Sequence, residues 1–152
     1  MFLGVTNLNL DAKGRLQVPV KHRERLRDSS GARLVVTINP RERCLWLYPE
    51  NEWREIERKV AKLPTLKGPN LMMQRLLLGH AQEVDMDSQG RMLLSAELRE
   101  YSGLEKRVAM VGEGHKFELW DADQWLEKRE EWLKQASEDN SELSDELQNL
   151  VL

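Results

Sequence analysis

A short motif occurs twice in this chain, 76 residues apart, and this repetition limits the possible folds more than any other feature. The first copy is Leu10–Leu16 (LDAKGRL) and the second is Met86–Met92 (MDSQGRM). The aspartate can accept a hydrogen bond from the backbone two residues on, and the glycine suits the last position of a tight turn. The motif therefore predicts two similar turns, each followed by an arginine. The residues expected to shape the turns are Asp11, Gly14, Asp87 and Gly90.

The repetition continues beyond the motif. At the same offset, Val18 corresponds to Leu94, and Arg23 corresponds to Arg99. Only two copies are present, which indicates an internal duplication and not a solenoid. Each half alone would be a marginal domain, because small domains bury a smaller fraction of their surface. We therefore expect either two halves that share one core or a stable oligomer.

Hydrophobic patterning predicts the same order of elements in both halves: strand, turn, strand, short helix, strand, strand, helix. In the first half, the two strands that flank the turn are expected to pair with each other across it. Pro19 fits the first position of the helix that follows, where its missing N–H costs nothing. The expected ranges are strands over 5–10, 15–18, 33–38 and 44–48, helices over 20–27, 50–63 and 71–78, and a linker over 65–70.

Charge is distributed unevenly along the chain, whose net charge is −3. Residues 1–48 hold nine Lys and Arg against four Asp and Glu, a net +5, whereas residues 121–152 hold three against ten, a net −7. Phosphate binding needs a local basic face and not a basic total. The N-terminal part therefore favours a nucleic-acid partner, although an ordinary solvated face explains the same charges equally well.

Several segments resemble the MraZ family of bacterial transcriptional regulators of the division and cell-wall gene cluster. The resemblance covers almost the whole chain, and its motifs are weak singly but specific together. One position departs from the family, because this chain has Leu3 where many members have arginine. The segments that carry the resemblance are residues 1–4 (MFLG), 10–19 (LDAKGRLQVP), 74–81 (QRLLLGHA), 86–91 (MDSQGR) and 116–120 (KFELW).

The resemblance implies a β-rich α+β fold, in which two AbrB-like units form a pseudo-two-fold swapped-hairpin barrel with flanking helices. The units are expected at residues 5–52 and 81–124, with a helical connection at 53–80 and a C-terminal helix and acidic tail at 125–152. It also implies a sequence-specific DNA-binding regulator, expected to repress, that binds repeated boxes of double-stranded DNA as a ring-like homo-oligomer. Such a protein would be cytoplasmic and associated with the nucleoid.

Arginine side chains at hairpin tips are suited to base recognition. Arginine can contact guanine O6 and N7 together in the major groove, which a two-stranded β-ribbon can enter. We expect Arg15 and Arg91 to contact bases, Lys13 to support them, and Lys21 and Arg23 to contact phosphate or lie close to it. The plain alternative is that each Asp–Arg pair only stabilises its turn, since exposed ion pairs contribute ~0–1 kcal/mol.

Other functional classes find little support. The sequence shows no glycine-rich phosphate loop and no motif for a Ser/His/Asp arrangement, so we do not expect an enzyme. His22, His80 and His115 are solitary, and Cys44 lies in an apolar stretch as a structural thiol, so neither a metal site nor a cofactor is expected. No apolar run approaches the ~20 residues of a membrane span, and the N-terminus does not resemble a signal peptide.

The C-terminal part suggests interactions with other protein surfaces. One apolar stripe is expected to be part of the core or a subunit contact. A second lies on a short helix that is not stable alone, so it must dock on the body or on a neighbouring molecule. The stripes are Trp125, Leu126, Trp132 and Leu133, then Leu143, Leu147 and Leu150. An alternative function is therefore an antitoxin-like interaction module that also binds DNA and whose acidic C-terminal segment captures a protein.

Overall fold

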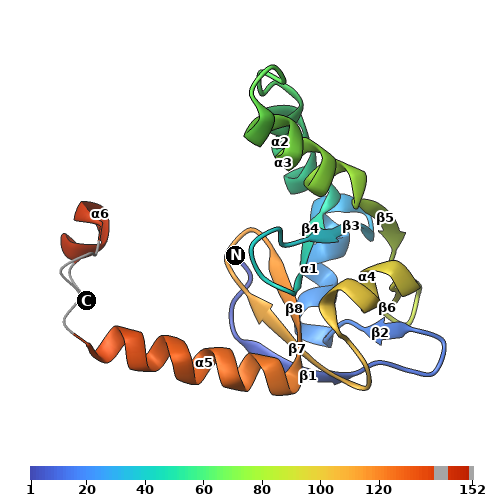
Figure 1. Ribbon diagram of the computed structural model, residues 1–152. Helices are drawn as coiled ribbons and strands as arrows, with labels where there is room; N and C mark the ends of the chain where they lie inside the picture. The colour runs from blue at the N-terminus through green and yellow to red at the C-terminus, as the bar shows by residue number, and fades with distance from the viewer. Residues whose placement is uncertain (139–143, 151–152) are drawn as a thin grey trace. The chain divides into compact units, whose positions relative to one another are not determined.

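The computed structural model describes residues 1–138 and 144–150, in a compact body, Met1–Ala122, and a C-terminal unit, Asp123–Leu152 (Figure 1). Helices hold 43% of the described residues and strands 28%, which confirms the mixed α+β class but not a predominance of strands. The strands are β1 (Val5–Asn9), β2 (Arg15–Gln17), β3 (Arg33–Ile38), β4 (Leu45–Pro49), β5 (Gln82–Asp85), β6 (Arg91–Leu93), β7 (Arg107–Gly112) and β8 (Phe117–Asp121). The helices are α1 (Val20–Ser30), α2 (Glu50–Ala61), α3 (Gly68–Gly79), α4 (Ala96–Ser102), α5 (Ala122–Ser137) and α6 (Asp145–Gln148).

The strands of the two halves pair with each other. Six form an antiparallel sheet in the order β1-β7-β8-β4-β3-β5, and β2 pairs with β6 in a second, two-stranded sheet. Exchanging equivalent strands of the two halves reverses this order and leaves it otherwise unchanged, which is consistent with an internal duplication. β1 from the first half pairs with β7 from the second, and β5 from the second pairs with β3 from the first. Closure of these sheets into a barrel stays a prediction.

The predicted pairing of the first two strands across their turn is wrong. β1 pairs with β7 along its whole length, from Val5 opposite Val111 to Asn9 opposite Arg107. Only an isolated bridge between Leu10 and Leu16 remains at the mouth of the turn. Local turn chemistry cannot reveal this exchange, because the partner strands lie about a hundred residues away in the sequence.

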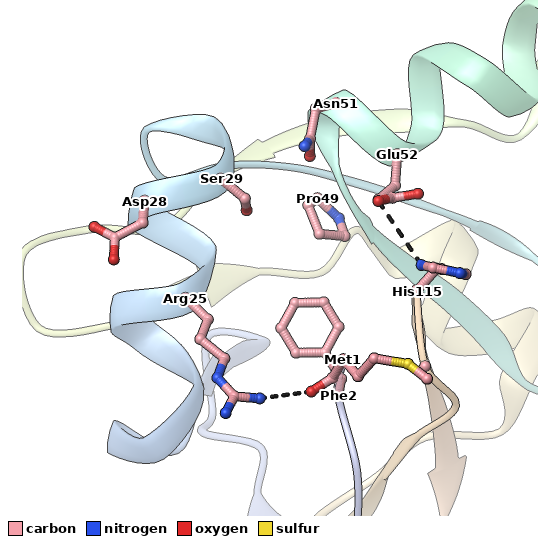
Figure 2. A pocket seen from close by; sticks show the side chains of 10 residues that line it. Met1, Phe2, Arg25, Asp28, Ser29, Pro49, Asn51, Glu52 and His115 are labelled. Atoms are coloured by element: carbon pink, nitrogen blue, oxygen red, sulfur yellow. Dashed lines mark hydrogen bonds and ion pairs between the residues drawn. The ribbon is translucent and has the colours of Figure 1, made fainter.

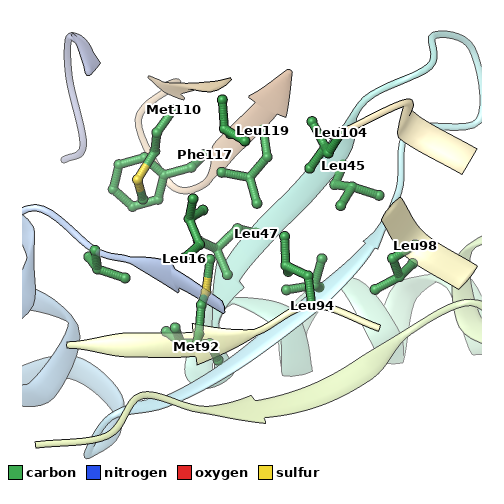
Figure 3. Close-up of a cluster of buried hydrophobic side chains, with 14 of the residues drawn as sticks. Leu16, Leu45, Leu47, Met92, Leu94, Leu98, Leu104, Met110, Phe117 and Leu119 are labelled. Atoms are coloured by element: carbon green, nitrogen blue, oxygen red, sulfur yellow. The ribbon is translucent and has the colours of Figure 1, made fainter. Parts of the chain in front are cut away.

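One hydrophobic core joins the two halves, so the expectation of a shared core is confirmed. Figure 3 shows Leu16 and Leu47 of the first half pointing toward the same interior as Met92 and Phe117 of the second half. All four side chains are almost completely buried. Each half therefore completes the apolar interior that the other half could not enclose alone.

Helix ends follow local signals. α1 runs past its expected end to Ser30, because Gly31 adopts the left-handed conformation (φ 62°) and its N–H closes the last turn on the Arg27 carbonyl. α3 begins at Gly68, inside the expected linker, because Pro69 suits the first turn of a helix. α2 and α3 lie side by side, and the Gln74 side chain donates to the Val60 carbonyl.

Aromatic and thiol side chains in the body are structural. Trp53 is buried against Tyr48, with the ring centroids 5.4 Å apart, as expected for a core residue. Cys44 is completely buried, and this burial raises the pKa of its thiol well above the usual range. No helix in the described ranges is long and apolar enough to cross a membrane.

The C-terminal unit contains most of α5 and the short α6. Within α5, the rings of Trp125 and Trp132 lie 5.7 Å apart, and Leu126 and Leu133 are exposed. The expected short helix near the C-terminus corresponds to α6, whereas Leu143 lies outside the described residues. Docking of either stripe stays a prediction.

Candidate nucleic-acid interface

The first copy of the motif forms a tight turn, Asp11–Arg15, called the first turn below. Its aspartate accepts three hydrogen bonds: Oδ1 from the N–H groups of Lys13 (2.9 Å) and Arg15 (2.8 Å), and Oδ2 from the Arg15 Nε (2.7 Å). The Gly14 N–H donates to the Asp11 carbonyl at 3.0 Å, which closes the turn. The Asp11 carboxylate thus fixes both the backbone of the turn and the side chain of the arginine at its end.

The second copy, Asp87–Arg91, called the second turn, repeats this arrangement. The Asp87 Oδ1 accepts from the N–H groups of Gln89 and Arg91 at 2.9 Å, and its Oδ2 accepts from the Arg91 Nε at 2.9 Å. The Gly90 N–H donates to the Asp87 carbonyl, also at 2.9 Å. The two arginines therefore occupy equivalent local environments in the two halves.

The aspartate of each turn binds its arginine, Arg15 or Arg91, through the Nε of the guanidinium. The side chains of Arg15 and Arg91 are 32% and 33% exposed, and their Nε atoms are occupied by the aspartates. Within the described ranges, their terminal Nη atoms have no hydrogen-bond partner. Those Nη atoms offer parallel donors to an incoming pair of acceptors, the geometry that guanine or phosphate oxygens match.

Hydrogen bonds within the turns lower the pKa values of the two aspartates. Hydrogen bonding to the Arg15 backbone N–H is the main cause of the lowered pKa of Asp11, and the Arg91 backbone N–H acts likewise on the pKa of Asp87. The carboxylates are therefore ionised at neutral pH, which keeps the arginines oriented.

We expect both turns to be insensitive to pH from 7 down to about 4. Because the folded pKa of Asp11 lies below its ordinary value of 3.8, its stabilisation is complete above that value and is lost as the pH falls through the folded pKa. An NMR titration that follows the Asp11 carboxyl carbon and the Arg15 Nε–H signal checks this. A shared midpoint above the ordinary aspartate pKa would contradict the ion pair.

The turn of each half contacts the other half. The Val18 N–H donates to the Gly90 carbonyl at 2.7 Å, and the Leu94 N–H donates to the Gly14 carbonyl at 2.9 Å. β2 and β6 run antiparallel between the turns, with Leu16 opposite Met92. The first and second turns are thus parts of one cross-linked structure.

Arginines from two helices pack against the glycines of the turns. Gly14 and Gly90 have φ of +83° and +79°, which side chains other than glycine rarely adopt. A Cβ at Gly14 would lie 2.9 Å from the Arg99 Cζ, and one at Gly90 would lie 2.7 Å from the Arg23 Cδ. Both glycines are therefore required by conformation and by close approach.

Alanine at either glycine should destabilise the protein. We expect Gly14→Ala to cost about 1–2 kcal/mol from the left-handed backbone, beyond any cost of displacing Arg99. Gly90→Ala should cost about 1 kcal/mol more, because a Cβ there lies closer to Arg23 than a Cβ at Gly14 lies to Arg99. Urea unfolding of both variants measures the difference. Gly68→Ala is the control, because a Cβ there meets nothing within 4 Å and its free energy of unfolding should not fall. Equal costs at Gly14 and Gly68 would contradict the strained turn.

The other residues predicted to bind DNA occupy different environments. Lys13 and Lys21 are exposed, on the first turn and on α1. Arg23 is half-buried, and its Nε donates to the Val18 carbonyl at 2.8 Å. The structure also brings Arg27 and Arg99 to the turns, and sequence reasoning gave neither a role. The offset of 76 residues between Arg23 and Arg99 was the signal that could have identified Arg99.

A pocket of about 380 Å³ lies elsewhere, between the N-terminus, α1 and α2 (Figure 2). Two of its side chains are engaged within the pocket: Arg25 donates to the Met1 carbonyl at 2.6 Å, and the His115 Nδ1 lies 3.8 Å from the Glu52 carboxylate. Its Ser29 hydroxyl donates to the Leu26 carbonyl. This pocket therefore presents no nucleophile paired with a base. Among the described residues, no three His, Cys, Asp or Glu side chains gather as a metal site would require.

The family model and the relatives that match this chain agree on one protein family. The family model described as "MraZ protein, putative antitoxin-like" matches twice, at residues 1–76 and 77–151. Proteins named Transcriptional regulator MraZ are 51% identical in Halorhodospira halophila, 48% in Thioalkalivibrio sulfidiphilus and 43% in Coxiella burnetii. Each alignment spans 152 residues and covers 100% of both chains. The two matches start 76 residues apart, the offset of the repeated motif.

Proposed function

The chain belongs to the MraZ family, and on this premise we propose that it is a transcriptional regulator that binds DNA through its two turns. Arg15 and Arg91 contact base edges in the major groove, and each is oriented by its own aspartate. The protein represses genes of the bacterial division and cell-wall cluster, in the cytoplasm and associated with the nucleoid. It is not an enzyme, and its relatives' names indicate regulation.

One observation carries this proposal: each guanidinium is fixed through Nε while its Nη atoms point to no partner in the described part of the chain. A pre-oriented pair of donors matches guanine O6 and N7, and each such bidentate contact discriminates against a wrong base by about 1–3 kcal/mol. An ion pair that only stabilised the turn would not need arginine, because lysine would also neutralise the carboxylate.

The exposed lysines supply the phosphate contacts. Lys13 lies on the first turn beside Arg15 and supports it, and Lys21 on the exposed side of α1 contacts phosphate. Arg23 lies close to the DNA backbone, but its Nε already donates to the Val18 carbonyl, so only its Nη atoms can reach a phosphate. The net charge of +5 in residues 1–48 provides the local basic face.

Affinity comes from assembly. We propose that residues 5–52 and 81–124 are two AbrB-like units of a pseudo-two-fold swapped-hairpin barrel, joined by the helices of 53–80 and followed by the C-terminal helix and acidic tail of 125–152. One pair of turns makes few contacts, so several subunits of a ring-like homo-oligomer bind adjacent repeated boxes through effective concentration.

A salt series tests the division of roles between Lys21 and Arg15. Affinity for DNA from upstream of the protein's own gene should fall steeply with salt. The logarithm of the binding constant should fall with the logarithm of the salt concentration, with a slope of about −0.9 per phosphate contact. Lys21→Ala should reduce that slope by roughly one contact per bound subunit and leave sequence preference unchanged. Lys59→Ala, also exposed but on α2, is the matched control and should leave the slope unchanged. If Lys21→Ala alters preference and not the slope, α1 contacts the bases and the assigned roles are reversed.

The second candidate is an antitoxin-like module, favoured by the family description and by the net −7 of residues 121–152. In that case the acidic segment would capture a small basic protein, and DNA binding would be secondary. Purification from the native host separates the two functions: a stoichiometric basic partner supports the second, and a gel shift with upstream DNA by the purified chain alone supports the first.

A further inference from the structure

We propose that the two turns are held crosswise, each positioned by arginines from the other half of the chain. Arg99 positions the first turn, and Arg23 together with Arg27 positions the second. The consequence for DNA rests on the proposed function, but the crosswise support is a property of the free protein. It makes Arg27 and Arg99 positioning residues for Arg91 and Arg15.

The support of the second turn comes from α1. The Arg23 Nε donates to the Val18 carbonyl, and the Val18 N–H donates to the Gly90 carbonyl. The Arg23 side chain fills the space that a Cβ of Gly90 would occupy. Arg23 therefore fixes the segment to which the second turn is bonded and also packs directly against that turn.

The support of the first turn is the equivalent one from α4. The Arg99 Nε donates to the Leu94 carbonyl at 3.1 Å, and the Leu94 N–H donates to the Gly14 carbonyl. The Arg99 guanidinium lies against Gly14, with its Cζ, Nε and Nη2 within 3.1 Å of a Cβ built there. The same chain of contacts thus runs in both directions between the halves.

The two supports are unequal. The Arg27 Nη2 donates to the Asp87 and Ser88 carbonyls at 3.3 Å, and the Gln17 Nε2 donates to the Gln89 carbonyl at 2.9 Å. At the offset of 76, the residues equivalent to Gln17 and Arg27 are Leu93 and Gly103, which have no polar side chain. Among the described residues, three side chains of the first half therefore hold the second turn, whereas Arg99 is the one that provides equivalent support for the first.

Amide hydrogen exchange in the free, full-length protein tests this arrangement. Arg99→Ala should speed exchange at the Lys13 and Arg15 amides about tenfold and leave those of Gln89 and Arg91 unchanged. Arg23→Ala should do the opposite. Arg27 is exposed, so Arg27→Ala should speed amide exchange only in the second turn, and by less than Arg23→Ala does. The Val36 amide in β3 reports any loss of global stability. Equal acceleration at both turns, or acceleration confined to the half that carries the mutation, would overturn the proposal.

A conservative variant separates shape from charge. Arg99→Lys keeps the positive charge but loses the planar guanidinium that lies on Gly14, so the first turn should still exchange faster than in the wild type. Wild-type exchange rates in Arg99→Lys would overturn the packing role.

DNA binding is measured separately. Arg99→Ala should reduce preference for the upstream duplex over a scrambled one, as Arg15→Ala does. If exchange shows the crossed pattern while preference is unchanged, the crosswise support stands and the proposed role of Arg15 is contradicted.

Discussion

Replacing Arg15 with alanine is expected to abolish sequence-specific DNA binding while the fold and the assembly stay intact. Loss of one bidentate contact costs about 1–3 kcal/mol, and this loss repeats in every subunit on the DNA, so preference for the specific duplex should fall at least about a hundredfold. The fold should survive, because the Asp11–Arg15 ion pair is exposed and such pairs contribute ~0–1 kcal/mol. Gel shifts with specific and scrambled duplexes, together with sedimentation and thermal unfolding, measure both parts.

Arg58→Ala is the matched control for Arg15→Ala. Arg58 is an exposed arginine on α2 whose ion pair, with Glu55, involves no part of either turn. Both variants remove one positive charge, so only a positional effect separates them. Arg91→Ala should weaken binding less than Arg15→Ala, because the second turn has Gln89 where the first has Lys13. Unfolding or loss of assembly in Arg15→Ala, with unchanged DNA affinity, would contradict the assigned role.

The second large effect concerns the shared core: Phe117→Ala should destabilise the body by about 3–5 kcal/mol. Phe117 lies on β8 in the second half and is completely buried. Its ring packs against Phe2 and His22 of the first half, with centroids 4.4 Å and 4.8 Å away. Because the halves share one core, unfolding by urea should shift as a single transition.

Phe117→Leu is the control for this core substitution. Leucine keeps most of the volume and the apolar character, so its cost should stay below about 1.5 kcal/mol. Circular dichroism and tryptophan fluorescence should report the same transition in both variants. Two separate transitions, with one half still folded after the other has melted, would contradict a common core.

Local patterns predicted the elements better than their pairing. The strand expected at residues 33–38 coincides with β3, and both halves show the expected order of elements. Such features depend on alternation, proline and glycine within a few residues. The pairing of β1 with β7 depends instead on contacts across about a hundred residues, so the turn after β1 wrongly suggested a simple hairpin.

The same distinction applies to the candidate site. The spacing of Asp11 and Arg15 places their side chains within reach across one turn, and the motif indicates this directly. The contact between Arg23 and Gly90 depends on the exchange of strands between halves, and no local pattern encodes it. Arg23 was assigned from its charge alone, and its hydrogen bond to Val18 became visible only in three dimensions.

Binding to DNA in which guanine is replaced by 7-deazaguanine tests the central claim most directly. This analogue removes the N7 acceptor from the major groove and leaves Watson–Crick pairing in place. With boxes mapped by footprinting upstream of the gene, the substitution should weaken wild-type binding by roughly tenfold. It should weaken the residual binding of Arg15→Ala by less, because that variant has already lost the Arg15 contact to N7 and keeps only that of Arg91. Equal weakening of the wild type and of Arg15→Ala would show that Arg15 does not contact guanine, and would contradict the account.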